Sequence, residues 1–521
     1  MDCRRTLSPA ASDTRGPPHS ESHSPHTVND LPIALETKDL IGILLIVLGS
    51  AGMTGALLFL PRLRPVALFL LAAGLVATDM FDIDIYSAYW YRGTTRGFEF
   101  TALDVVAIGL LLSSLIRPRP DTPRWVRPAS LGLMFVFVAY CLVTTLLANP
   151  MIFGLYEVSK MLRGILFFLA GAQFVRRASD LGVIALGLAL AVCFETTLTV
   201  RERFFFNEYR PAGTLDHANS LSMYLCLVTP VLVAAACSNF SGWIRAACWA
   251  GVAAGTVSIL LTLSRAGMPI FALGVGGTLA WCASWRPTPG KAILAFLAAV
   301  AVAGAVLKAW PLVIERYGQA TLEEEYFDAA GESRGYYFRQ AGVLLDHQPM
   351  GVGLNNWSYW VSREYGEPLG MHYQNYDNLV YAPPTETIYE MRFAAPAHNL
   401  GVLTVGEIGW AGLALLLVLW LRWLAMGASF LFARRADPLH RLGVGIAFGI
   451  LGTFMQSFTE WTFRQTQIFL TFNLLAGTLA ALYALKQAEK SAAAVAEFEP
   501  LPEELEWQPA GVAAQFQASD N

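Results

Sequence analysis

The sequence predicts an all-α polytopic integral membrane protein with about 12–13 transmembrane helices and one long external loop. Of its 521 residues, 55% are hydrophobic and only 15% are charged, and the mean hydropathy is +0.45. A water-soluble domain needs more polar surface than this. A polar stretch of nearly ninety residues, 310–397, stands between two apolar runs. In a chain this apolar, such a loop indicates a function at one face of the membrane.

Residues 1–39 are rich in Ser, Pro, His and Thr, and we expect them to form a disordered tail. No apolar segment lies near the start, so this tail does not read as a cleavable signal peptide. The following parts are N-terminal transmembrane helices in 40–309, the long loop in 310–397, C-terminal transmembrane helices in 398–490 and a cytoplasmic tail in 491–521.

A hydrocarbon core about 30 Å thick needs roughly 20 apolar residues in a helix. The candidate spans are 40–60, 64–80, 100–116, 129–148, 162–175, 181–199, 219–237, 244–263, 268–284, 292–309, 398–421, 442–458 and 466–485. The first two are the least secure as separate crossings. If one of them is re-entrant, the chain has twelve spans with both ends inside; otherwise the N-terminal tail lies outside.

Lys and Arg in the short connectors indicate the orientation, because cytoplasmic loops carry an excess of both. Basic residues gather in the alternate connectors 117–128, 176–177, 286–291, 434–441 and 486–490, which we therefore expect to be cytoplasmic. The segments 81–99, 149–161, 201–218, 310–397 and 459–465 are then expected outside.

Other function classes find little support. The net charge of −4 gives no indication of a nucleic-acid partner. There is no CxxC pair, and the sequence predicts neither a metal site nor a cofactor. Six of the seven cysteines fall in or beside apolar runs and read as core residues: Cys141, Cys193, Cys226, Cys237, Cys248 and Cys282.

Arginines on the expected outer face run against the charge bias and need a reason. Arg210 and Arg265 stand at the outer ends of adjacent spans, whereas the long loop has five Arg and no Lys against twelve Asp and Glu. The planar fork of Arg binds phosphate oxygens bidentately and stays charged when partly desolvated. Arginines could also contact ordinary phospholipid headgroups or pair with the carboxylates of the loop. For Arg210 and Arg265 we favour a diphosphate ligand.

His398 begins the next span and is the candidate general base, because histidine takes up a proton near neutral pH. A single histidine at a membrane interface is otherwise a hydrogen-bonding surface residue. Weaker acid–base candidates are Asp216, Glu407 and Glu460, and His217 and Arg339 are possible supporting residues.

The glycines of residues 347–353, His-Gln-Pro-Met-Gly-Val-Gly, do not form a nucleotide-binding loop. The third glycine of that motif is missing, and no strand–helix context surrounds it. Pro349 and the two glycines instead indicate a turn after a helix at about 333–346, and His347 is expected to be structural.

Four segments together resemble the O-antigen ligase and Wzy-type O-antigen polymerase family. They are residues 210–219 (Arg-Pro-Ala-Gly-Thr-Leu-Asp-His-Ala-Asn), 263–267 (Leu-Ser-Arg-Ala-Gly), 347–353, and 397–399 (Ala-His-Asn) with 406–409 (Gly-Glu-Ile-Gly). They follow the order of the family around the long loop, and the resemblance covers roughly 130–485. The first segment ends in Asp216-His217-Ala218-Asn219 where the family usually has an Asn-Pro-Asn-like end, so the role of His217 stays open.

The resemblance implies a GT-C-like, metal-independent, inverting glycosyltransferase at the periplasmic face of the bacterial inner membrane. Such an enzyme moves a glycan from an undecaprenyl diphosphate carrier to an acceptor hydroxyl. Transferred by motif, Arg210 and Arg265 hold the diphosphate and His398 acts on the acceptor. A ligase uses lipid A–core as the acceptor and a polymerase uses another carrier-linked repeat unit; we favour the ligase.

A transporter or flippase, or a non-catalytic assembly protein, is the hypothesis from another class. Transporters place ionisable residues at mid-membrane. The span centres predicted here are nearly free of charge, with Glu195 and Asp104 the nearest cases.

Overall fold

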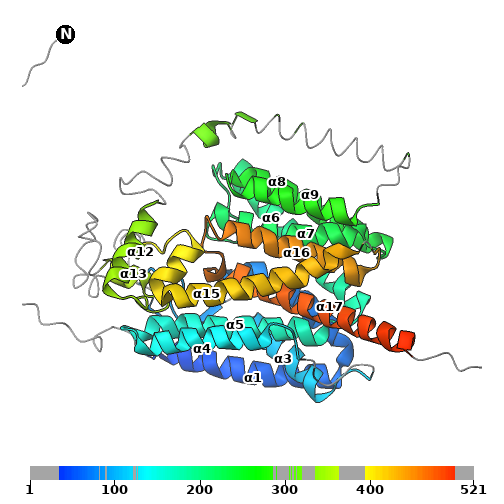
Figure 1. Ribbon diagram of the computed structural model, residues 1–521, viewed down its shortest axis with the longest axis horizontal. Coiled ribbons are helices and arrows are strands. Elements are labelled where there is room, and N and C mark those ends of the chain that lie inside the picture. Colours follow the sequence, from blue (N-terminus) through cyan, green and yellow to red (C-terminus); the bar gives the residue numbers. More distant parts are fainter. Residues whose placement is uncertain are drawn as a thin grey trace, which may run out of the picture.

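The computed structural model describes residues 35–80, 82–88, 91–120, 125, 127–284, 335–362, 394–433 and 435–498, with scattered positions between 289 and 318. These residues form long helices that run side by side (Figure 1). By length and composition, eight helical segments in the described part of the chain are able to cross a membrane. The prediction of an all-α polytopic membrane protein is confirmed.

The helices of the bundle are α1 (Thr37–Phe59), α2 (Arg64–Gly74), α3 (Ala102–Ile116), α4 (Leu131–Leu147), α5 (Met151–Phe174), α6 (Ala178–Phe205), α7 (Ala218–Cys237), α8 (Gly242–Thr262), α9 (Gly267–Cys282), α15 (Leu400–Ala428), α16 (Pro438–Gln456) and α17 (Thr466–Phe498). Most begin and end within a few residues of the apolar runs. The expected span 292–309 lies largely outside the described residues, as does most of the loop 310–397.

Several helices extend beyond their predicted bounds, because charged residues interrupt the apolar pattern. α5 begins at Met151, so the expected outer connector 149–161 is mostly the first turns of this helix. α6 continues to Phe205, through Arg201 and Arg203. Helix α17 likewise reaches Phe498, within the expected tail.

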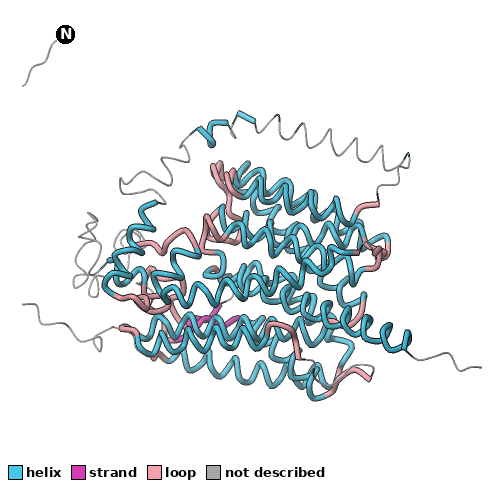
Figure 2. Tube along the Cα trace, viewed as in Figure 1, coloured by secondary structure: helices cyan, strands magenta, loops and turns pink. Residues whose placement is uncertain are grey.

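Loops collect at the two ends of the bundle (Figure 2). One end carries α12 (Gly335–His347), α13 (Trp357–Trp360) and a two-stranded antiparallel sheet of β1 (Asp82–Ile85) and β2 (Phe98–Thr101). We call it the His398 end, because residue 398 directly precedes α15. The sheet is an element that the all-α prediction did not include.

The two early apolar runs are separate helical segments of opposite direction. α1 starts at the His398 end, where it contacts β1. It finishes at the opposite end, where the Arg64 side chain donates to the carbonyl of Arg117 at 2.9 Å. From there α2 and η3 (Leu75–Met80) lead back to β1.

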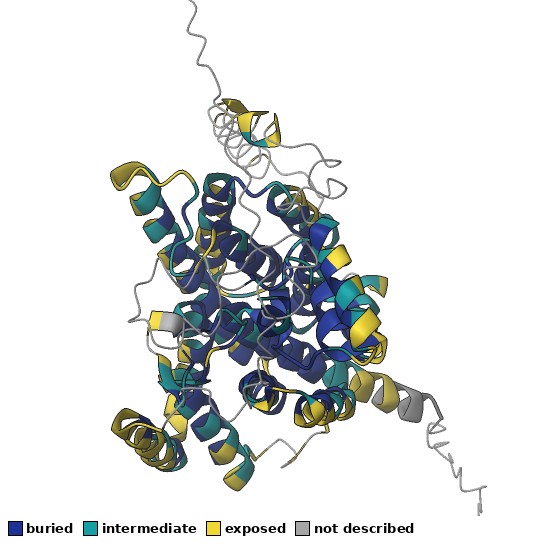
Figure 3. Cartoon of the chain, turned by 90° about the vertical axis from the view of Figure 1, so that its left-hand side faces the viewer, coloured by how far each residue is buried: buried dark blue, intermediate teal, exposed yellow. Residues whose placement is uncertain are grey.

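Helix α7 lies at the centre of the packing, and Ala218 and all residues from Ser220 to Ala236 are buried. In a view along the helices, buried residues fill the middle and exposed ones the rim (Figure 3). Glycines on α16 let the two backbones approach: a Cβ at Gly445 would lie 2.8 Å from the carbonyl oxygen of Pro230 on α7. Small residues serve the same purpose wherever membrane helices pack closely.

Helix α15 has a kink at Ile408 and Gly409, where Gly409 has φ 69°. A kink frees backbone carbonyls, which in a membrane need other partners. The turn after α12 supplies them: the amide of Val352 donates to the Gly406 carbonyl at 3.0 Å, and that of Gly353 to the Glu407 carbonyl at 2.8 Å. The predicted helix at about 333–346 and the turn after it are confirmed by α12 and by these contacts. The turn supports α15 at Gly406 and Glu407, between His398 and the kink.

Candidate functional site

His398 lies against Glu460, the carboxylate in the connector between α16 and α17. His398 Nδ1 is 2.8 Å from Glu460 Oε2, and the Glu460 side chain is only 4% exposed. A carboxylate accepts only, so Nδ1 carries the proton in the neutral ring. The other nitrogen, Nε2, is then the basic one. The His398 side chain is 33% exposed, which leaves it accessible.

Hydrogen bonds between the two connecting segments hold this pair in place. The amide of Leu400 donates to the Ser457 carbonyl at 2.9 Å, and Asn399 Nδ2 donates to the Phe458 carbonyl at 2.8 Å. Asn399 also caps α15, since its side chain accepts from the Val402 amide at 3.0 Å. The start of α15 and the end of α16 therefore form one unit around His398.

Glu460 joins His398 to the first predicted arginine. Asn219 Nδ2 donates to Glu460 Oε1 at 2.7 Å, and Arg210 donates through a terminal nitrogen to Asn219 Oδ1 at 2.6 Å. The result is a continuous chain, Arg210–Asn219–Glu460–His398, from three segments distant in sequence. We call it the site chain.

The second predicted arginine belongs to the same neighbourhood. Ser264, next to Arg265, donates to Asn219 Oδ1 at 3.3 Å, and Tyr317 donates to the Arg265 carbonyl at 2.8 Å. Burial lowers the pKa of Arg210, and the positive charges of Arg316 and Arg265 lower it further, whereas Glu460 opposes them. Arg210, Arg265 and Arg316 thus gather positive charge in a partly buried place, and an anion with more than one negative charge would relieve their mutual repulsion.

Aromatic rings flank His398 on two sides. Its ring centroid lies 5.2 Å from that of Trp461 and 5.9 Å from that of Tyr337 on α12. Such rings can pack against the apolar faces of a sugar. The long loop thus contributes Tyr337 to the surroundings of His398 through α12.

The other predicted residues have different places. His217 is exposed and caps α7, because its Nδ1 accepts from the Asn219 amide at 3.1 Å. Asp216 is exposed and lines a hollow that Arg210 shares. Arg339 is exposed on α12, about 200° around the helix from Tyr337 at about 100° per residue. The structure brings neither Asp216 nor Arg339 into the site chain.

Glu407 is buried and pairs with Arg464 instead of facing the site. Arg464 NH1 also lies 3.4 Å from Glu157 of α5, which in turn is 2.9 Å from Lys160. Lys160 donates to the Arg464 carbonyl at 2.8 Å. This buried charge cluster fixes the segment between Glu460 and α17 against α5 and α15, so Glu407 supports the site indirectly.

The prediction that the span centres are nearly free of charge is wrong for α5. Besides Glu157 and Lys160, α5 carries Arg163, which binds both carboxylate oxygens of Asp104 at 2.9 Å. An isolated buried charge is very costly, but paired and hydrogen-bonded charges are tolerated. Glu195 is buried too, and accepts from the hydroxyl of Thr214 at 2.6 Å.

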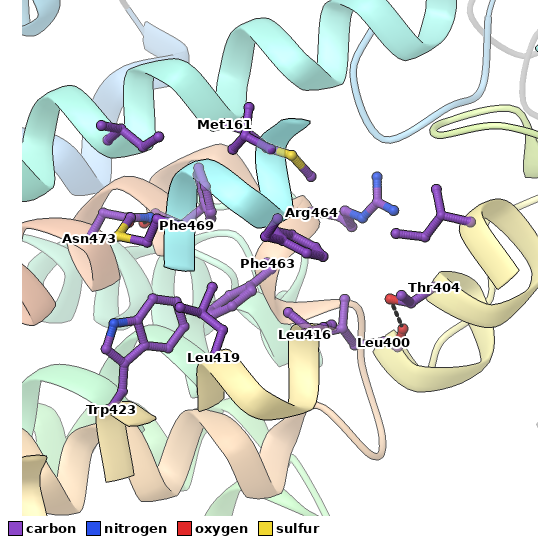
Figure 4. Close-up of a pocket in the computed structure, with 15 residues that line it drawn as sticks. Met161, Leu400, Thr404, Leu416, Leu419, Trp423, Phe463, Arg464, Phe469 and Asn473 are labelled. Carbon is purple, nitrogen blue, oxygen red and sulfur yellow. Dashed lines mark hydrogen bonds between the residues drawn. The ribbon is translucent and has the colours of Figure 1, made fainter. Parts of the chain in front are cut away.

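A small apolar cavity of about 40 Å³ lies beside this cluster between α4, α5, α15 and α17. Figure 4 shows Arg464 and Thr404 toward one side of it and Trp423 toward the other. Leu400, two residues after His398, also lines it. The cavity thus lies in the apolar interior beside the buried charge cluster.

Sequence reasoning missed the connecting role of Asn219, the aromatic pair and the buried charge cluster. Asn219 stood in a quoted motif, and Glu460 was only a weaker acid–base candidate. The sequence did hold a signal for Glu460. It follows the predicted span 442–458, which ends on the same expected outer face at which the span of His398 begins.

In a comparison with protein families, residues 250–417 match the family model described as O-Antigen ligase. The matched region runs from within α8 to α15 and includes Ser264, Arg265 and His398, whereas Arg210, Asn219 and Glu460 lie outside it. A comparison with curated proteins found no match.

Proposed function

Residues 250–417 match the O-antigen ligase family model, and from that premise we propose that this chain belongs to the family and transfers a glycan from an undecaprenyl diphosphate carrier to an acceptor hydroxyl. The transfer takes place at the periplasmic face of the bacterial inner membrane, which the His398 end would face. The site chain is the observation that carries the proposal. Through Glu460 and Asn219 it links the candidate base His398 to Arg210, a candidate ligand of the diphosphate.

In the proposed reaction the acceptor oxygen attacks the anomeric carbon of the glycan while the bond from that carbon to the diphosphate oxygen breaks. His398 takes the acceptor proton on Nε2, and Glu460 stabilises the imidazolium that results. The configuration at the anomeric carbon inverts. Undecaprenyl diphosphate leaves with an additional negative charge, which Arg210 and Arg265 stabilise.

The positions of the arginines support this division of roles. A diphosphate presents several oxygens, and arginines bind such oxygens as planar forks. Arg316 contributes positive charge to the same place, as the lowered pKa of Arg210 indicates. No metal is needed for the charge neutralisation in this scheme.

Ligase and polymerase differ in the acceptor, and we favour the ligase, with lipid A–core as acceptor. Deletion of the gene distinguishes them: long carrier-linked chains accumulate when a ligase is missing, and single repeat units accumulate when a polymerase is missing. The buried charges of α5 are the one observation that favours a transporter. Under that alternative, transport would continue in His398→Ala, and no glycan would be transferred by the purified wild type.

The proposal is tested by glycan transfer in proteoliposomes with an undecaprenyl diphosphate-linked donor. His398→Ala should abolish transfer while the protein remains in the membrane. Arg210→Lys and Arg265→Lys should lower transfer by about 10–100-fold despite their conserved charge, since a lost charged hydrogen bond costs about 1.5–3 kcal/mol. Arg203→Lys is the matched control, because Arg203 lies outside the site chain and donates to the nearby carbonyls of Glu208 and Tyr209. Full activity in His398→Ala would contradict the proposed base.

A further inference from the structure

A hollow at the end of the bundle opposite His398 takes no part in the proposed reaction. It has a volume of about 620 Å³ and lies between the last turns of α15, residues 482–490 of α17, the start of α16 and η7 (Ser429–Phe432). The positive-inside pattern predicts that this end is cytoplasmic.

Positive charge exceeds negative charge around the hollow. Arg422, Arg435, Lys486 and Lys490 line it. Arg435 pairs with Glu489 at 3.0 Å. Within the described part of the chain, Arg422, Lys486 and Lys490 form no ion pair, so their charges are available to an anionic ligand.

The carboxylate of Asp437, which also lines the hollow, is used within the protein. It accepts from the His440 amide at 2.9 Å and so caps α16. Neither carboxylate of the wall therefore offsets Arg422, Lys486 or Lys490 directly.

Aromatic rings hold two of these cations in position. Lys486 Nζ lies 4.6 Å from the ring centroid of Phe430 and donates to the Ser429 carbonyl. The guanidinium of Arg422 lies 5.6 Å from the ring centroid of Tyr483. Cation–π contacts of this kind restrict a long side chain while its charge stays available.

Much of the remaining wall is apolar, although Ser429, His440 and Gln487 also line it, and the apolar part distinguishes the hollow from a site for a small soluble anion. Leu439, Leu482 and Leu485 line it, and Phe432 at its edge is 89% exposed. A second hollow of about 320 Å³ shares Arg422 and adds Arg127. Cationic groups above apolar side chains at the ends of membrane helices match both parts of a lipid, its headgroup and its acyl chains.

We infer that this hollow binds an anionic glycerophospholipid, with Arg422 and Lys486 on the phosphate and the leucines against the acyl chains. The site is independent of glycan transfer, so failure of either proposal leaves the other intact. Because the lipid contacts α15, α16 and α17 together, it would hold these helices at their ends.

The inference is tested on the purified full-length chain in detergent by native mass spectrometry with phosphatidylglycerol or phosphatidylcholine. Wild type should retain phosphatidylglycerol preferentially. Arg422→Gln/Lys486→Gln should bind it about 25-fold more weakly, from about fivefold for each cation near an anionic lipid surface. Arg422→Lys/Lys486→Arg keeps the charges and should stay within about threefold of wild type.

Arg245→Gln is the matched control, since Arg245 is exposed at the same end and does not line the hollow. If the double variant does not fold, Arg422→Gln alone should weaken binding about fivefold. Equal retention of the two lipids, an equal loss in Arg245→Gln, or displacement of the lipid by inorganic phosphate at matched ionic strength would each overturn the inference.

Discussion

Replacing Glu460 by Gln tests the site chain most sharply, because the change is isosteric and reverses one hydrogen bond. The new amide oxygen can still accept from Asn219 Nδ2, as Glu460 Oε1 does at 2.7 Å. Its NH₂ group then faces His398 Nδ1, which must become an acceptor. The histidine proton moves to Nε2, and the ring loses the basic nitrogen that faces the acceptor hydroxyl.

The expected magnitude follows from two contributions. A hydrogen bond to a charged group is worth about 1.5–3 kcal/mol, which corresponds to roughly 10–150-fold in rate. General-base catalysis contributes about 10²–10⁴-fold. Since some base function is retained after a tautomer change, we expect kcat to fall by about 10²–10³-fold. KM for the donor should change little, because Arg210 and Arg265 are intact.

The assay is steady-state transfer in proteoliposomes, with Glu489→Gln as control because that carboxylate is exposed at the opposite end. His398→Ala/Glu460→Gln should be no slower than His398→Ala alone, since both changes remove the same function. If Glu460→Gln keeps more than half of the wild-type kcat, or if the two losses add, Glu460 is not a positioning residue for His398.

Three further predictions concern orientation, packing and pH. In a Cys3→Ser background, Gly342→Cys on α12 should react with an impermeant thiol reagent from outside, whereas Gly242→Cys on α8 should react only after permeabilisation. Both glycines have open space around them, so the new side chains fit. The reverse labelling pattern would show that the topology is inverted. Gly445→Ala should lower the thermal midpoint in detergent, because the new Cβ would lie 2.6 Å from that of Ala234 and overpacking costs about 1–3 kcal/mol. The control Gly276→Ala meets nothing within 4 Å and should leave the midpoint unchanged. Equal midpoints for the two variants would mean that α7 and α16 separate easily. Burial, with Glu99 and Asp82, raises the pKa of Asp84 to about 6 from 3.8. Since the folded state holds this proton more tightly than the unfolded state, the stabilisation is complete below pH 3.8 and is lost as pH rises through about 6. Asp84→Asn should remove that part of the pH dependence of the thermal midpoint, and an unchanged slope would show that Asp84 is not its source.

Hydropathy was sufficient for the bundle because burial in lipid imposes long apolar runs on the sequence. It was insufficient for α5, since Glu157, Lys160 and Arg163 read as the end of a span when their partners are unknown. Those partners, such as Arg464 and Asp104, come from other elements. Sheet β1–β2 was missed for a similar reason, because its strands are four residues each and lie within an aromatic connector.

For the site, the sequence indicated His398, Arg210 and Arg265 by residue type and position. It did not indicate how they are connected, because the connection depends on which spans lie side by side. Asn219 illustrates the difficulty: its amide binds Arg210 nine residues away and Glu460 at a separation of 241 residues. Arg339 and Glu407 looked comparable in sequence, but one is exposed away from Tyr337 and the other is neutralised by Arg464.

The kink of α15 has a mechanical meaning for an enzyme that works at a membrane surface. Bilayers differ in thickness, and membrane helices respond by tilting. An unbroken α15 would transmit each tilt directly to His398. Because the helix is interrupted at Ile408 and Gly409, we expect residues 400–407 to stay attached to the turn after α12 while the remaining turns adjust to the lipid. We therefore expect the residues of the site chain to keep their arrangement when the thickness of the membrane changes.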